Sequence, residues 1–223
     1  MKKFLIVIII LLSSKVFAHI DHYKKYDKIE MDIFRNGELI GYNYYFFTKK
    51  GNETTVTNQI KFSVKLLGAT IFQVEGYGEE KYIKDQLISY ESKTLQNDKE
   101  KFVNLVFDKN KFNIKGSSYS GEASINNIVG NWWNHKILQT DSQISPVSGS
   151  IKEQVVTFVG KEKIQQYGKI YNVHHFTLKS KDMSLPKDKR LDFNIWYDQE
   201  SSMIIKVAYS RMGNWEYRLK NFE

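Results

Sequence analysis

The chain has 223 residues, a formal charge of +8 and no cysteine. The absence of cysteine excludes a disulfide framework, a thiol nucleophile and a thiolate metal site. Lysine supplies nearly all of the positive charge; there are only four arginines, and arginine is the residue preferred for bidentate contacts with phosphates and bases. We therefore expect no nucleic-acid partner.

The first eighteen residues have the pattern of a secretory signal peptide. Lys2 and Lys3 precede an unbroken apolar run over residues 4–12, and the sequence reaches a cleavage-site pattern at Ala18. An apolar run this short does not form a permanent membrane span. We expect cleavage near Ala18 and a periplasmic or secreted mature chain that begins at His19, with no stable membrane span.

Alternating apolar and polar residues separated by turn residues predict seven consecutive strands in the first half of the chain. Asn36-Gly37 is a strong hairpin signal between the first two. The alternation is clearest around Phe62. The predicted strands cover residues 28–33, 39–48, 55–66, 70–82, 87–94, 101–107 and 111–115.

The two-residue alternation stops in the middle of the chain. From Ile125 to Ile137 apolar residues recur every four positions, which is helical spacing, and the stretch carries the adjacent Trp132 and Trp133. We predict one short Trp-containing helix near residues 125–138. It would pack into or across the concave side of a curved sheet.

After a polar loop over residues 140–151, strand patterns resume. The predicted strands cover residues 155–159, 171–179, 191–197, 203–209 and 215–219. About a dozen strands are too many for a flat open sheet, so the sheet should curl or close. We predict an all-β fold in one domain, residues 19–223: an antiparallel meander curved into a half-barrel or open barrel.

The aromatic residues allow two interpretations. The strand over residues 39–48 is apolar on both faces, so a second layer must cover one of them. Either the aromatic side chains are simply the core, or part of the concavity holds an apolar ligand. The candidate ligand-binding residues are Tyr42, Tyr44, Phe62, Trp132, Trp133 and Trp196.

The chain resembles an uncharacterised family of exported bacterial β-rich proteins, a domain of unknown function. The resemblance rests on residues 191–198, 203–209 and 214–217, and also on residues 33–41 and 131–135. Such domains are similar in outline to curved-sheet carriers of the lipoprotein-localisation type, which cradle acyl chains. The resemblance implies a curved sheet and an exported location, and the family offers no established catalytic residues to carry over.

The histidines offer a different kind of site. Cleavage after Ala18 would leave His19 at the N-terminus, where the α-amine and imidazole can chelate copper with a third nitrogen from His135, His174 or His175. The alternative is a terminal histidine that binds no metal ion.

We find no catalytic motif: the Gly-x-Ser-x-Gly elbow, the phosphate-binding loop, His-Glu-x-x-His and the dinucleotide fingerprint are all missing. The sequence therefore favours non-enzymatic binding of a hydrophobic or amphipathic ligand, such as a lipid or other apolar small molecule, without a cofactor. The alternatives are a copper-binding protein that uses His19 and a structural or interaction module with an unknown protein partner.

Overall fold

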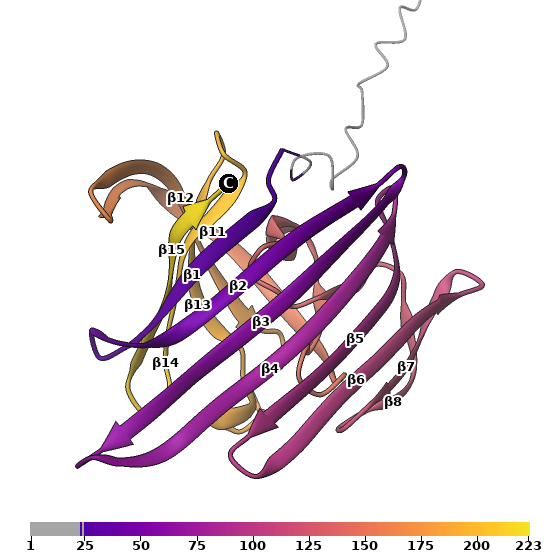
Figure 1. Ribbon diagram of the computed structural model, residues 1–223, viewed down its shortest axis with the longest axis horizontal. Helices are drawn as coiled ribbons and strands as arrows, with labels where there is room; N and C mark the ends of the chain where they lie inside the picture. The colour runs from indigo at the N-terminus through magenta and orange to yellow at the C-terminus, as the bar shows by residue number, and fades with distance from the viewer. Residues whose placement is uncertain (1–22, 24) are drawn as a thin grey trace, which may run out of the picture.

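The computed structural model describes Tyr23 and residues 25–223, which form one large sheet (Figure 1). The strands are β1 (Lys28–Arg35), β2 (Glu38–Lys50), β3 (Glu53–Leu66), β4 (Ala69–Ile83), β5 (Gln86–Gln96), β6 (Lys99–Asp108), β7 (Lys111–Gly116), β8 (Ser120–Ser124), β9 (Ile128–Val129), β10 (Ser142–Ile144), β11 (Ile151–Gln166), β12 (Lys169–Ser180), β13 (Asp192–Asp198), β14 (Met203–Ser210) and β15 (Asn214–Phe222). After Tyr23, the described residues also include the 3-10 helices η2 (His135–Gln139) and η3 (Lys187–Lys189).

The strand order is β8-β7-β6-β5-β4-β3-β2-β1-β15-β14-β13-β12-β11-β10-β9. Neighbours pair antiparallel throughout, except that β9 and β10 are parallel. β1 pairs with β15, which brings the two ends of the meander together in the middle of the sheet. The edge strands β8 and β9 are consecutive in the chain, but no ladder joins them. The predicted all-β, antiparallel and open meander is confirmed.

The predicted helix over residues 125–138 is wrong. Ile128 and Val129 form β9, Trp132 and Trp133 lie in a turn, and only η2 winds as a short 3-10 helix. The backbone finds partners outside the segment: β9 pairs with β10, and the Trp132 N–H donates to Tyr45 Oη at 3.1 Å. Apolar spacing of four here reflects burial of an extended chain on several sides, which a short window cannot distinguish from a helix.

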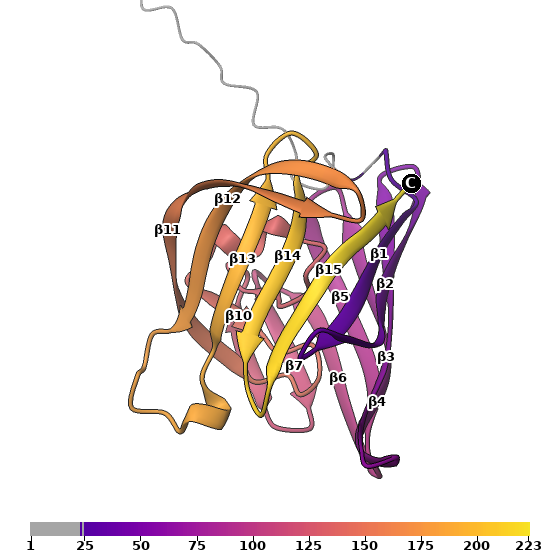
Figure 2. The same ribbon diagram turned by 90° about the vertical axis from the view of Figure 1, so that its left-hand side faces the viewer.

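The hairpin of β11 and β12 is longer than the sequence predicts. A strand end is expected at Gly160, but β11 continues through a bulge between Phe158 and Gly160 and ends at Gln166. Its tip arches over neighbouring strands at the top of Figure 2. There Gln166 Nε2 donates to the carbonyls of Ile205 in β14, at 3.1 Å, and Leu219 in β15, at 2.7 Å.

Tyr167 extends this attachment to β1. Its hydroxyl donates to Asp32 Oδ2 at 2.7 Å, and Lys220 lies 3.6 Å from the same carboxylate. Burial and the neighbouring Asp32 charge raise the pKa of Tyr167. The tip therefore ties the two halves of the sheet across the pairing of β1 with β15.

The core lies inside the curved sheet. Inward side chains of both halves surround the segment 128–150, which runs along the concave side and carries η2 (Figure 1). Buried residues with under 2% of their surface exposed include Met31, Tyr45, Leu105, Ile137 and Leu178. No helix within the described residues is long and apolar enough to cross a membrane.

Candidate functional site

One end of the interior is filled around Trp133. The indole ring is 1% exposed and meets the rings of Tyr23, Phe47 and Tyr82 edge to face, with centroids 5.0, 5.4 and 6.0 Å away. Such edge-to-face pairs are the preferred geometry of packed aromatic rings. We call this cluster of four residues the closed end. Trp133 belongs to the core there and does not line an empty space.

A buried carboxylate holds Trp133 in position. Glu80 in β4 accepts from Trp133 Nε1 at 2.9 Å, from Asn131 Nδ2 at 2.7 Å and from Tyr82 Oη at 2.5 Å. Burial raises the pKa of the Glu80 carboxyl, and the three donors partly offset this rise. Glu80 thus fixes the central segment to the wall of the sheet.

The other end of the interior is hollow. A cavity of about 530 Å³ lies between β3, β4 and β5 on one side and β14 and β15 on the other. Its volume falls in the range of small-molecule sites, ~300–1,000 Å³. Its apolar walls come mainly from Ile60, Phe62, Val64, Phe72, Val74 and Trp215. We call it the apolar chamber.

A second cavity of about 510 Å³ adjoins the first. Tyr209, Arg211 and Tyr217 line both cavities, so the two lie side by side and share these three residues. Trp132 lies in its wall, with its ring 5.1 Å from that of Phe193. We call this the cationic chamber, because its remaining lining includes Lys152, Lys179, Lys187 and Arg190.

The two chambers together form the open end. The turn between β14 and β15 and the loop between β12 and β13, with η3, lie at the lower end of Figure 2. Burial raises the pKa of Tyr209 to about 12, and it also raises the pKa of Tyr217. Both phenols are therefore neutral near pH 7 and offer hydrogen bonds without charge.

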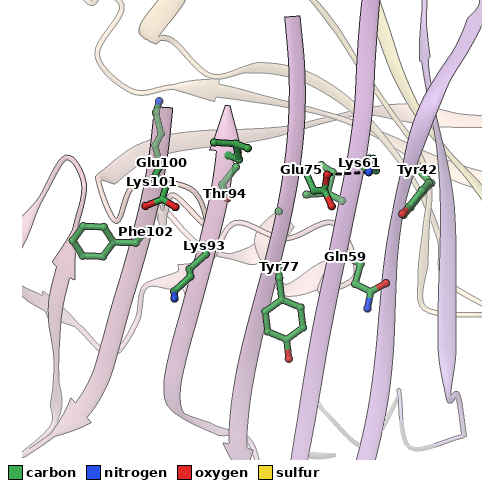
Figure 3. Close-up of a pocket in the computed structure, with 13 residues that line it drawn as sticks. Tyr42, Gln59, Lys61, Glu75, Tyr77, Lys93, Thr94, Glu100, Lys101 and Phe102 are labelled. Atoms are coloured by element: carbon green, nitrogen blue, oxygen red, sulfur yellow. Dashed lines mark ion pairs between the residues drawn. The ribbon is translucent and has the colours of Figure 1, made fainter. Parts of the chain in front are cut away.

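A separate groove of about 610 Å³ crosses β2 to β6 on the outer face (Figure 3). Tyr42, Tyr77 and Phe102 contribute aromatic rings to it. Lys61 and Glu75 form an ion pair at 2.9 Å beside Tyr42. Charges of both signs neutralise one another here, and the rings stand apart, so the groove lacks an enclosed apolar region.

Two further candidate residues lie on the outer face. Tyr44 stacks on Tyr42, with centroids 4.5 Å apart, and Lys28 Nζ lies 5.2 Å from its ring centre. Trp196 stacks on His175 at 4.6 Å and donates from Nε1 to Glu162 Oε1 at 2.7 Å. Both aromatic rings strengthen contacts across strands rather than line the interior.

The six predicted ligand-binding residues are therefore dispersed. Phe62 lines the apolar chamber and Trp132 lines the cationic chamber. Trp133 fills the closed end, and the remaining three, Tyr42, Tyr44 and Trp196, lie outside the interior. Sequence reasoning missed Tyr209, Arg211 and Tyr217, which line both chambers. The alternation of Tyr209 along β14 and of Tyr217 along β15 is the only available signal, and Arg211 lies in the turn between these strands.

The predicted copper ligand His19 lies outside the described residues. His135, one of its suggested partners, contacts Tyr23 Oη through Nδ1 at 2.7 Å. His175 lies 3.1 Å from Glu162 and 2.9 Å from Asn194 Oδ1. Within the described residues no three His, Asp or Glu side chains are grouped to hold a metal ion.

Comparison with known proteins identifies a fold and a family. The crystal structure of a beta-barrel-like protein of domain of unknown function DUF1849 from Brucella abortus matches with a TM-score of 0.60 and 10% identity, over 88% of this chain and 96% of that one. At this identity the match shows the fold alone.

A DUF1329 family protein from Desulfovibrio piger aligns at a TM-score of only 0.23, with 11% identity over 92% of this chain and 88% of that one, and it supports no argument about the fold. No curated protein matches the chain. Residues 31–220 match the family described as domain of unknown function DUF6134, so the chain belongs to that family.

Proposed function

We propose that the protein binds a hydrophobic or amphipathic ligand, such as a lipid, in the open end of its interior. The observation that supports the proposal most directly is the apolar chamber of about 530 Å³, which is lined by side chains from both halves of the sheet. Because the chamber adjoins a polar one, it suits a ligand with an apolar and a polar part. From the pattern of the first eighteen residues, we place this activity in the periplasm or outside the cell.

Burial of an apolar chain can supply enough free energy to offset the cost of association. Burying about ten methylene groups contributes ~8 kcal/mol at ~0.8 kcal/mol each. Association offsets a part of this, at least ~4 kcal/mol. Burial of the apolar chain alone therefore supports a dissociation constant of about 1 mM, and contacts with the polar part of the ligand would tighten it. Binding without catalysis also agrees with the absence of catalytic motifs from the sequence.

Filling the apolar chamber tests the proposal. Val74 lines it, and a Val74→Trp substitution adds an indole to its wall. The matched control is Val106→Trp, since Val106 is 54% exposed on β6. Fluorescence of the neutral probe N-phenyl-1-naphthylamine measures occupancy, and far-ultraviolet circular dichroism checks the fold.

We expect the wild type and Val106→Trp to bind the probe, and Val74→Trp to bind at least tenfold more weakly. Native mass spectrometry of protein purified without denaturant should show a lipid-sized extra mass that organic solvent releases. Equal probe binding by folded Val74→Trp and the wild type would overturn the assignment to this chamber. Absence of binding by the wild type would overturn the proposal itself.

A further inference from the structure

We propose that the ligand is an anionic amphiphile whose carboxylate or phosphate headgroup binds in the cationic chamber and whose single acyl chain extends into the apolar chamber. This inference rests on the proposed function and specifies its ligand class. Three features carry it: the charge of the cationic chamber, the way its arginines are held, and the residues that the two chambers share.

The cationic chamber has a large excess of positive charge. Five basic side chains and one carboxylate, that of Asp192, line it. Lys179 Nζ lies 3.9 Å from Asp192 Oδ1, which leaves the other four cations without a carboxylate in the lining. Within the described residues, none of these four forms an ion pair within 4.0 Å. They are Lys152, Lys187, Arg190 and Arg211.

Both arginines are anchored through neutral acceptors. Arg190 Nε donates to the carbonyl of Leu185 at 2.5 Å, and Arg211 Nη2 donates to the carbonyl of Arg190 at 3.1 Å. A carbonyl orients a guanidinium without cancelling its charge, and each guanidinium has five N–H donors. Two positioned guanidinium groups match the paired oxygens of a carboxylate or phosphate.

One nearby carboxylate already has its own partners. Asp182, on the loop between β12 and β13, accepts from the N–H and hydroxyl of Ser184 at 2.8 and 2.7 Å. These bonds lower the pKa of Asp182, and the charge of Arg190 adds a smaller contribution. The charge of Arg190 therefore acts on Asp182, but in the described structure Asp182 accepts no hydrogen bond from the Arg190 guanidinium.

The path from charge to apolar surface is short. Arg211 lines both chambers, so a headgroup at its guanidinium would lie beside the apolar chamber. Beyond it the walls are the rings of Phe62 and Trp215, which lie 5.5 Å apart, and then the side chains of β3 and β4. An acyl chain attached to the headgroup would contact these walls along its length.

A series of ligands of one chain length tests the inference. Dodecanoate, dodecyl phosphate, dodecanol and dodecyltrimethylammonium differ in headgroup only, and each can displace N-phenyl-1-naphthylamine. We expect at least one of the two anions to bind tenfold or more tightly than dodecanol, and the cation to bind most weakly. The anion that binds more tightly identifies the headgroup. Raising the salt concentration should reduce the preference for anions.

Charge-removing variants locate the headgroup. The double variant Lys152→Gln, Lys187→Gln changes two side chains of the cationic chamber for which the described structure shows no ion pair. The matched control, Lys93→Gln with Lys61→Gln, removes the same charge from the outer groove. We expect the first pair to lose at least fivefold in anion affinity with dodecanol binding unchanged, and the control pair to bind like the wild type.

Two outcomes would overturn the inference while leaving the proposed function intact. One is dodecanol binding as tightly as both anions in the wild type. The other is an equal loss of anion affinity in the chamber pair and the control pair, since the preference would then come from overall charge. If no member of the series displaces the probe, or the probe itself does not bind, the proposed function fails together with the inference.

Discussion

Trp132 and Trp133 are adjacent in the chain, yet they serve opposite ends of the interior. Trp133 is packed among three aromatic rings and donates its indole N–H to Glu80. Trp132 is half-buried in the wall of the cationic chamber, and no described residue accepts from its indole N–H. The comparison shows that a buried hydrogen-bond acceptor, more than residue type, decides which aromatic ring becomes core and which is left beside a cavity.

Truncating each tryptophan in turn should expose this difference most strongly. Trp133→Ala should lower the free energy of unfolding by ~3–5 kcal/mol, because it empties a close-packed site and removes one of the three donors to the buried Glu80 carboxylate. Trp132→Ala should cost less than ~2 kcal/mol, since its ring already borders a cavity. Urea unfolding measures the free energy of unfolding of both variants. Equal losses would show that the two ends are packed alike.

Substitutions of Glu80 should cause the next largest loss of stability at the closed end. Glu80→Leu should destabilise the protein by about 3 kcal/mol, because the side chains of Trp133, Asn131 and Tyr82 lose a common buried partner. Glu80→Gln keeps the shape and one acceptor oxygen, so it should cost ~1 kcal/mol or less. A larger loss for Gln than for Leu in urea unfolding would contradict the proposed anchoring role.

The pH dependence of the free energy of unfolding should reflect the ionisation of Glu80. Burial raises the pKa of Glu80 in the folded state, so its ionisation opposes folding. Its contribution to stability is complete below the unfolded pKa near 4.5 and is lost as the pH rises through the folded pKa. The free energy of unfolding of the wild type minus that of Glu80→Gln, measured by urea unfolding from pH 4 to 8, should therefore fall as the pH rises. A difference that rises with pH would refute this sign.

The smallest effect should come from the tip of the hairpin of β11 and β12. Gln166→Leu removes two hydrogen bonds to buried carbonyls and should cost ~1–2 kcal/mol. Its neighbour Gln165 is exposed, so Gln165→Leu serves as the control and should stay within ~0.5 kcal/mol of the wild type. Ligand binding at the open end should be unchanged in both variants, as measured by displacement of the neutral probe.

Much of the sheet is predictable because its signals are local. Asn36-Gly37 makes the first hairpin turn, with positive φ at both positions, and the alternation around Phe62 places that ring inward as expected. Local signals fail where the partners of a segment lie far along the chain. The extension of β11 to Gln166 is one such case, because Gln166 donates to carbonyls of β14 and β15.

The candidate site was harder to predict for the same reason. Phe62 and Trp132 were identified as aromatic residues of the concavity, and each lines one chamber. Arg211 and Tyr217 could not be assigned, because they reach Phe62 only through the pairing of β1 with β15. Nothing in the sequence near β15 indicates which strand it will pair with, so side chains gathered by that pairing escape detection.

The pairing of β1 with β15 also has a consequence for folding. Lys28 N–H donates to the carbonyl of Glu223 at 2.9 Å, so residues 28 and 223 lie side by side, while β8 and β9 are separated by only three residues. A circular permutant that links these ends and opens within residues 125–127 would run along the sheet from β9 to β8, each strand beside its predecessor. In this permutant the mean sequence separation between paired strands would be smaller, while the folded structure would stay the same. It should therefore fold faster than the natural chain.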